Sequence, residues 1–91
     1  MMYTLFIATP EEVIFNGDAK DLKAPGASGY FEVLSQHAPT ISTLQAGKFE
    51  YTDAKDQKFH YMISGGIIEV DHNKVSILID SLESYSPSEL A

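Results

Sequence analysis

Hydrophobic and polar residues alternate with a period of two along most of this chain. Because successive side chains of a β-strand point to opposite faces, this period predicts strands with one buried face. The last of these series is interrupted only by Leu78, and no helical period is evident before residue 81. The alternating apolar positions are Tyr3, Leu5 and Ile7; Phe49 and Tyr51; Phe59, Tyr61 and Ile63; and Val75, Ile77 and Ile79.

Turn-forming residues separate these stretches at intervals of about eight to twelve residues, a spacing typical of all-β sandwiches and barrels. Two hairpins are expected, one joining 47–52 to 58–63 across "DAKDQ" and one joining 66–70 to 74–80 across "DHN". Gly65 and Gly66 lie between these hairpins, where the missing Cβ permits a bulge or a close strand crossing.

The strands therefore predict one all-β domain, an antiparallel two-sheet β-sandwich spanning residues 1–80. The final stretch, 81–91, reads "SLESYSPSELA". It is polar, contains Pro87 and is too short for a stable isolated helix. We expect it to form a short polar tail.

Composition narrows the range of functions. The chain has 91 residues and no cysteine, so disulfides and thiolate chemistry are excluded. Its net charge is −7 and all six cations are lysines, which argues against nucleic acid as a partner. The apolar run near the N-terminus is too short for a signal peptide or a membrane helix, so a cytosolic protein is expected.

His37, within "GYFEVLSQHAPTIS", is the most reactive side chain in the first half of the chain. It could act as a general base, ligate a metal or simply belong to a turn that a partner contacts. No nucleophile motif accompanies it, and His37, His60 and His72 lack the short spacings that build metal sites. Neither "APGASG" nor "SGG" matches a phosphate-binding loop. We therefore expect no catalytic residue, metal or cofactor, and we favour a contact role for His37.

Apolar residues are in excess between residues 30 and 44, where alternation is weak. A thin sandwich either buries them between its sheets or leaves some as an exposed patch for a partner, and the pattern allows both outcomes. The residues concerned are Tyr30, Phe31, Val33, Leu34, Ile41 and Leu44.

Three ordered segments make the chain resemble a known family: "TPEEVIFNG", "APGASGYFEVLSQHAPTISTLQAG" and "SGGIIEVDHNKVSILID". In combination they are similar to the epsilon subunit of the F-type ATP synthase, over residues 3 to about 80. The resemblance implies a two-sheet β-sandwich of about ten strands, in agreement with the alternation described above.

The resemblance also implies a function. Epsilon subunits of this family are non-catalytic parts of the central stalk that bind the gamma subunit and rest on the c-ring, in a complex with alpha and beta. They support the coupling of hydrogen-ion or sodium-ion transport to ATP synthesis. The resemblance assigns Tyr30, Phe31, Glu32, Gln36 and His37 to the c-ring end, and Thr9, Pro10, Ile41, Ser42, Thr43 and Leu44 to the gamma side.

Two departures from the family pattern affect these expectations. Family members continue into an inhibitory helical hairpin, whereas this sequence stops at Ala91, so self-inhibition through this chain is not expected. Tyr30 stands where many relatives carry an acidic residue, which exchanges a charge for a phenol. With no transit peptide before Met1, the expected location is the cytoplasmic face of a bacterial inner membrane, bound peripherally through the complex.

Two other functions are compatible with parts of the sequence. A generic β-sandwich adaptor or ligand-binding module shares the fold but binds a soluble partner. A small enzyme that uses His37 would require a pocket of several hundred cubic ångströms. The combined motifs favour the ATP synthase subunit over both.

Overall fold

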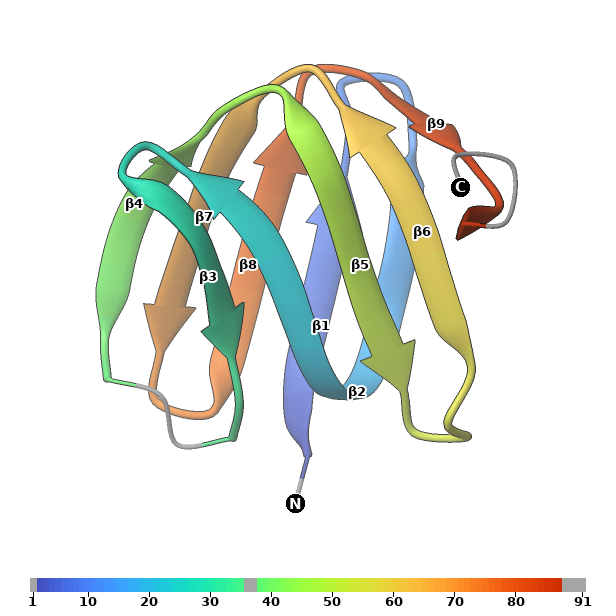
Figure 1. Ribbon diagram of the computed structural model, residues 1–91. Helices are drawn as coiled ribbons and strands as arrows, with labels where there is room; N and C mark the ends of the chain where they lie inside the picture. Colours follow the sequence, from blue (N-terminus) through green and yellow to red (C-terminus); the bar gives the residue numbers. More distant parts are fainter. Residues whose placement is uncertain (1, 36–37, 88–91) are drawn as a thin grey trace.

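The computed structural model describes residues 2–35 and 38–87, and nine strands occupy most of them (Figure 1). In these residues no α-helix forms, and none of the elements has the length and hydropathy that a membrane-crossing helix requires. The strands are β1 (Tyr3–Ala8), β2 (Val13–Gly26), β3 (Gly29–Val33), β4 (Thr40–Leu44), β5 (Gly47–Asp53), β6 (Lys58–Ile63), β7 (Gly66–Asp71), β8 (Lys74–Ile79) and β9 (Leu82–Ser84).

The strands form two packed layers that share the long strand β2 (Figure 1). Sheet I consists of β4, β7, β8, β1 and the first half of β2, which pairs with β1 from Val13 to Ala19. Sheet II consists of β3, the second half of β2, β5, β6 and β9. A single pairing of Gly26 with Leu44 connects β2 to β4 at the rim. The expected two-sheet sandwich is confirmed.

Both expected hairpins are present, as the pairings of β5 with β6 and of β7 with β8 show. The expectation of purely antiparallel sheets is wrong at one place, because β1 and β8 pair in parallel. These strands come from opposite ends of the chain, and alternation within a strand does not encode the direction of its neighbour.

The stretch expected to be a polar tail contains a further strand. Residues 82–84 form β9, which pairs with the edge of β6, so the strands do not end at residue 80. Leu82 packs against the core, while Glu83 and Ser84 are exposed. Three residues carry too little alternation to be recognised as a strand from sequence.

The core lies between the sheets and takes the inward-facing residue of nearly every alternating pair. Tyr51 is its aromatic centre: its ring stacks on Phe59 with centroids 4.9 Å apart and packs at the same distance against Phe15. The buried hydrophobic residues include Tyr3, Leu5, Ile7, Leu22, Val33, Phe49, Ile68, Val75, Ile77 and Ile79. The sheets thus share one core, and their outer faces are available for contact.

Candidate partner-binding surface

Sheet I carries a row of mostly apolar residues on its outer face. The row follows the strand register from Val13 to Ala8, Leu78, Ile67 and Thr43, each paired with the next across neighbouring strands. Leu78 and Ile67 are paired side by side and are 53% and 42% exposed, which is unusual for large apolar neighbours on one face. Val13, at 56%, is separated from Leu78 by Ala8, which is buried. We call these five residues the apolar row.

Ile41 extends this surface along β4, two residues before Thr43 and on the same face. It is the most exposed large hydrophobic side chain in the described part of the chain, at 70%. Its neighbours in register are Glu69 and, beyond it, Ser76. A small hollow of about 230 Å³ lies among Ile41, Ile67, Glu69, Ser76 and Leu78.

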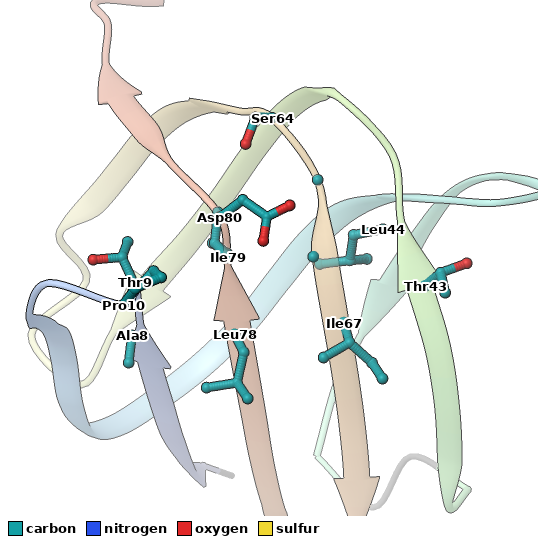
Figure 2. Close-up of a pocket in the computed structure, with 12 residues that line it drawn as sticks. Ala8, Thr9, Pro10, Thr43, Leu44, Ser64, Ile67, Leu78, Ile79 and Asp80 are labelled. Carbon is teal, nitrogen blue, oxygen red and sulfur yellow. The ribbon is translucent and has the colours of Figure 1, made fainter.

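An open groove of about 690 Å³ adjoins the row, where the ends of β1, β8 and β4 meet the β6–β7 connection (Figure 2). Leu78 and Ile67 lie along one side of it, and Ala8, Thr9 and Pro10 form another (Figure 2). Thr43, Leu44, Ser64 and Asp80 complete most of the lining. The groove widens the apolar row into a surface that an extended or helical segment can occupy.

The turn between β1 and β2 is held by Thr9. Its backbone N–H donates to the carbonyl of Glu12 at 2.9 Å, and its Oγ1 accepts from the N–H groups of Glu11 and Glu12, both at 3.3 Å. Such side-chain bonds are typical of Ser and Thr in turns. They fix the position of Pro10 at the rim of the groove.

Glycine is required on the opposite side of the groove. Gly65 has a φ of 143°, a conformation that other residues rarely adopt, and the backbone N–H of Asp80 donates to its carbonyl at 3.1 Å. A Cβ on Gly66 would lie 2.2 Å from the carbonyl oxygen of Leu78. The missing Cβ at Gly66 therefore permits a close approach between the backbones of the paired strands β7 and β8, rather than a bulge or a strand crossing.

The residues assigned to the gamma side divide between the two faces of sheet I. Thr9, Pro10 and Thr43 line the groove, and Ile41 lies next to the apolar row. Leu44 is 5% exposed and belongs mainly to the core. Ser42 is half-buried on the inward side, and its hydroxyl donates to the carbonyl of Thr43.

The residues assigned to the c-ring end are spread along β3. Tyr30, at the start of the strand, is 62% exposed and its hydroxyl accepts from the N–H of Lys48 at 2.9 Å. Phe31 faces inward against the core and occupies the space over Gly26. Glu32 is exposed opposite Lys23 and closest to the following loop. Gln36 and His37 lie outside the described residues.

The apolar residues in excess between residues 30 and 44 are partly buried between the sheets and partly exposed. Val33 and Leu44 are buried, Phe31 is half-buried, and Tyr30, Leu34 and Ile41 are exposed. Sequence reasoning missed Val13, Ile67 and Leu78, which contribute most of the exposed apolar row. The signal was present in Leu78, which breaks its alternating series, and in the consecutive apolar pair Ile67 and Ile68.

The geometry offers little for catalysis. The groove has the volume of an enzyme pocket, but its lining contains one carboxylate, Asp80, and no histidine. The hydroxyl of Ser64 interacts with the backbone of Ser81 rather than with a base. Within residues 2–35 and 38–87 no cluster of three metal-ligating side chains occurs. Nδ1 of His60 lies 3.8 Å from Oε2 of Glu50, and Nδ1 of His72 lies 2.6 Å from Oδ1 of Asp71. None of these four residues lines the groove.

Comparison with known proteins gives consistent matches. The family model described as "ATP synthase, Delta/Epsilon chain, beta-sandwich domain" matches residues 2–85. The ATP synthase epsilon chain of Protochlamydia amoebophila is 45% identical over 84 residues, covering 92% of this chain and 57% of the relative. That of Chlorobaculum tepidum is 35% identical over 80 residues, covering 88% and 91%.

A solved structure shares the fold. A chain of the Euglena gracilis mitochondrial ATP synthase, in a structure of OSCP, F1 and the c-ring, superposes with a TM-score of 0.85 at 22% identity. The match covers 98% of the present chain and 59% of that chain. The present chain also covers 61% of the epsilon chain of Salinibacter ruber, to which it is 37% identical over 91 residues, spanning 91% of its own length. The chain thus spans about three fifths of the length of several relatives that it matches.

Proposed function

This chain belongs to the family of ATP synthase delta and epsilon chain β-sandwich domains, and on that premise we propose that it is a central-stalk epsilon subunit. In this role it joins the gamma subunit to the c-ring, in a complex that also contains alpha and beta. It carries out no reaction itself. It supports the coupling of ion flow to ATP synthesis by transmitting torque as a stiff element of the rotor.

The observation that carries this proposal is the exposed apolar surface on sheet I. Four residues that the family resemblance assigns to the gamma side, Thr9, Pro10, Ile41 and Thr43, lie in or beside the groove and the apolar row. Exposed large side chains in a row favour burial against a partner, at roughly 25 cal/mol for each Å² covered. We therefore assign the gamma interface to this face, with Leu78 and Ile67 as its central contacts.

The c-ring contact belongs to the segment that begins with β3 and continues to His37 in the sequence. Tyr30 and Glu32 point outward from β3, so their side chains can contact another subunit. Phe31 faces the core, so its contribution is to hold β3 in place. Gln36 and His37 stay in this proposal through the family resemblance alone.

The epsilon chains of Protochlamydia amoebophila, Salinibacter ruber and Chlorobaculum tepidum, to which this chain is similar, are bacterial. This supports a location at the cytoplasmic face of a bacterial inner membrane, where the chain is bound peripherally through the complex. The chain then contacts lipid only where the assembly brings it close to the bilayer.

Co-purification tests the proposal directly. Tagged chain is added to detergent-solubilised membranes of the source organism, and its partners are identified by mass spectrometry. Recovery of gamma, alpha, beta and c subunits in a fixed ratio is expected. Recovery of a soluble partner without these subunits would instead favour a general β-sandwich adaptor, and an intrinsic hydrolase or transferase activity would favour an enzyme.

A further inference from the structure

The negative charge of this protein is concentrated on one side of the sandwich. Sheet I and its turns carry six carboxylates and one lysine, Lys74, among the described residues. Sheet II and its turns carry six carboxylates and the five other lysines. The carboxylates of the sheet I side are Glu11, Glu12, Asp18, Glu69, Asp71 and Asp80. The face with the exposed apolar row is therefore also the acidic face.

Two of these carboxylates lie directly at the apolar surface. Glu69 lies between Ile41 and Ser76 in the register and borders the small hollow. Asp80 follows the end of β8 and lines the groove, with Oδ2 about 4.0 Å from where a Cβ of Gly65 would be (Figure 2). The two acids thus lie at opposite sides of Leu78 and Ile67.

Neither acid is neutralised within the described part of the molecule. The ion pairs found there join Lys20 to Asp56, His60 to Glu50 and His72 to Asp71, so Glu69 and Asp80 have no cationic partner. Lys74 is on the same face, but it pairs in register with Asp71 and Thr4 at the far end of β8. A partner that covers this face without supplying cations would leave two carboxylates partly desolvated and unpaired, which is costly.

We propose that the partner segment on this face is a basic amphipathic one. It places apolar side chains on Leu78, Ile67 and Ile41, and lysine or arginine side chains against Glu69 and Asp80. The inference rests on the proposed function, because it states the chemistry of the gamma-subunit surface that binds here. A second copy of this chain is disfavoured, since two acidic faces repel each other, and an anionic lipid surface is disfavoured for the same reason.

Salt dependence of binding tests this inference. The dissociation constant for a purified alpha–beta–gamma complex of the same organism is measured at ionic strengths from about 0.05 M to about 1 M, a range over which surface charges become screened. The double variant Glu69→Gln/Asp80→Asn is compared with the matched control Asp56→Asn/Glu83→Gln. Both remove two negative charges, but the control removes them from exposed positions on the sheet II side, outside both proposed contact surfaces.

At low salt the Glu69→Gln/Asp80→Asn variant is expected to bind about threefold to tenfold more weakly, as for two rim charge pairs. Its affinity should depend less on salt than that of the wild type, and the control should match the wild type. If the wild type binds and the affinities of the wild type and both variants depend on salt in the same way, the inference is overturned and the proposed function remains intact. Absence of wild-type binding would overturn both, as would a wild-type dimer that Leu78→Asp dissociates.

Discussion

The phenol of Tyr3 on β1 donates a hydrogen bond of 2.8 Å to the backbone carbonyl of Val33 on β3. The two strands belong to different sheets and do not pair with each other, so this bond ties sheet I to sheet II. The Tyr3 ring is 2% exposed and Val33 is fully buried. Val33 is the last residue of β3, so the bond also anchors the strand that carries Tyr30 and Glu32 of the proposed c-ring contact.

Removal of this hydroxyl should destabilise the sandwich. We expect Tyr3→Phe to lower the free energy of unfolding by about 1–2 kcal/mol, because a buried carbonyl loses its donor while the ring still fills its space. Urea denaturation measures the change. Tyr30→Phe is the matched control, since its hydroxyl bonds an exposed backbone N–H and water can replace it. Equal losses of unfolding free energy in the two variants would show that the buried bond between the sheets stabilises the fold no more than the exposed bond of Tyr30 does.

Alkaline pH should destabilise the protein through its buried phenols. Burial raises the pKa of Tyr3 above its ordinary value of 10.0, and the nearby carboxylates of Asp21 and Glu32 add to the effect. Burial likewise raises the pKa of Tyr51, with Tyr61 and then Asp53 as further causes. In the unfolded chain these phenols ionise near pH 10, whereas in the folded protein they stay protonated.

The sign follows from these raised pKa values. The stabilisation is complete below about pH 10 and is lost as the pH rises towards the folded-state pKa values, by up to about 1.4 kcal/mol per pH unit for each phenol. Urea unfolding between about pH 8 and about pH 11 measures the slope. Tyr3→Phe should show a shallower decline than the wild type, and parallel curves would contradict the assignment to Tyr3.

Gly66 should not accept a side chain. A Cβ at this position would meet the carbonyl oxygen of Leu78 at 2.2 Å and the Cα of Ile79 at 3.1 Å, both of them backbone atoms that cannot rotate away. We expect Gly66→Ala to cost at least about 2 kcal/mol, measured by thermal unfolding. In Gly17→Ala the nearest atom is a ring carbon of Phe15 at 3.3 Å, so this control should cost clearly less. The reverse order would contradict the close approach of the β7 and β8 backbones at Gly66.

Much of this fold could be predicted from the sequence because burial and alternation coincide in the longer strands. Tyr3, Leu5 and Ile7 are all buried, as are Val75, Ile77 and Ile79. Alternation says which face of a strand is buried but not which strand lies beside it. The parallel pairing of β1 with β8 and the sharing of β2 between two sheets therefore emerge only in three dimensions.

The candidate surface was only half predictable for the same reason. Family resemblance identified Thr9, Pro10, Ile41 and Thr43, which lie near one another in the fold. Leu78 and Ile67 are 11 residues apart in sequence but face each other across β8 and β7, and Val13 joins them from the start of β2. A surface assembled by cross-strand register has no local sequence pattern. The interruption at Leu78 and the consecutive apolar pair Ile67 and Ile68 were its only traces in the alternation.

The apolar row gives the sharpest test of the proposed gamma interface. Leu78 on sheet I and Met62 on sheet II are 53% and 40% exposed, so truncation to alanine removes similar apolar groups from opposite faces. Neither variant should change the free energy of unfolding by more than about 0.5 kcal/mol, because both side chains are largely outside the core. Leu78→Ala should nevertheless raise the dissociation constant for the alpha–beta–gamma complex about tenfold, as expected for a central apolar contact. Met62→Ala should leave it within about twofold of the wild type.

Since no charge is removed, the salt dependence of binding should be unchanged in Leu78→Ala, which separates its effect from that of Glu69 and Asp80. Weakening by Met62→Ala alone would place the interface on sheet II, and equal weakening by the two variants would contradict its restriction to sheet I.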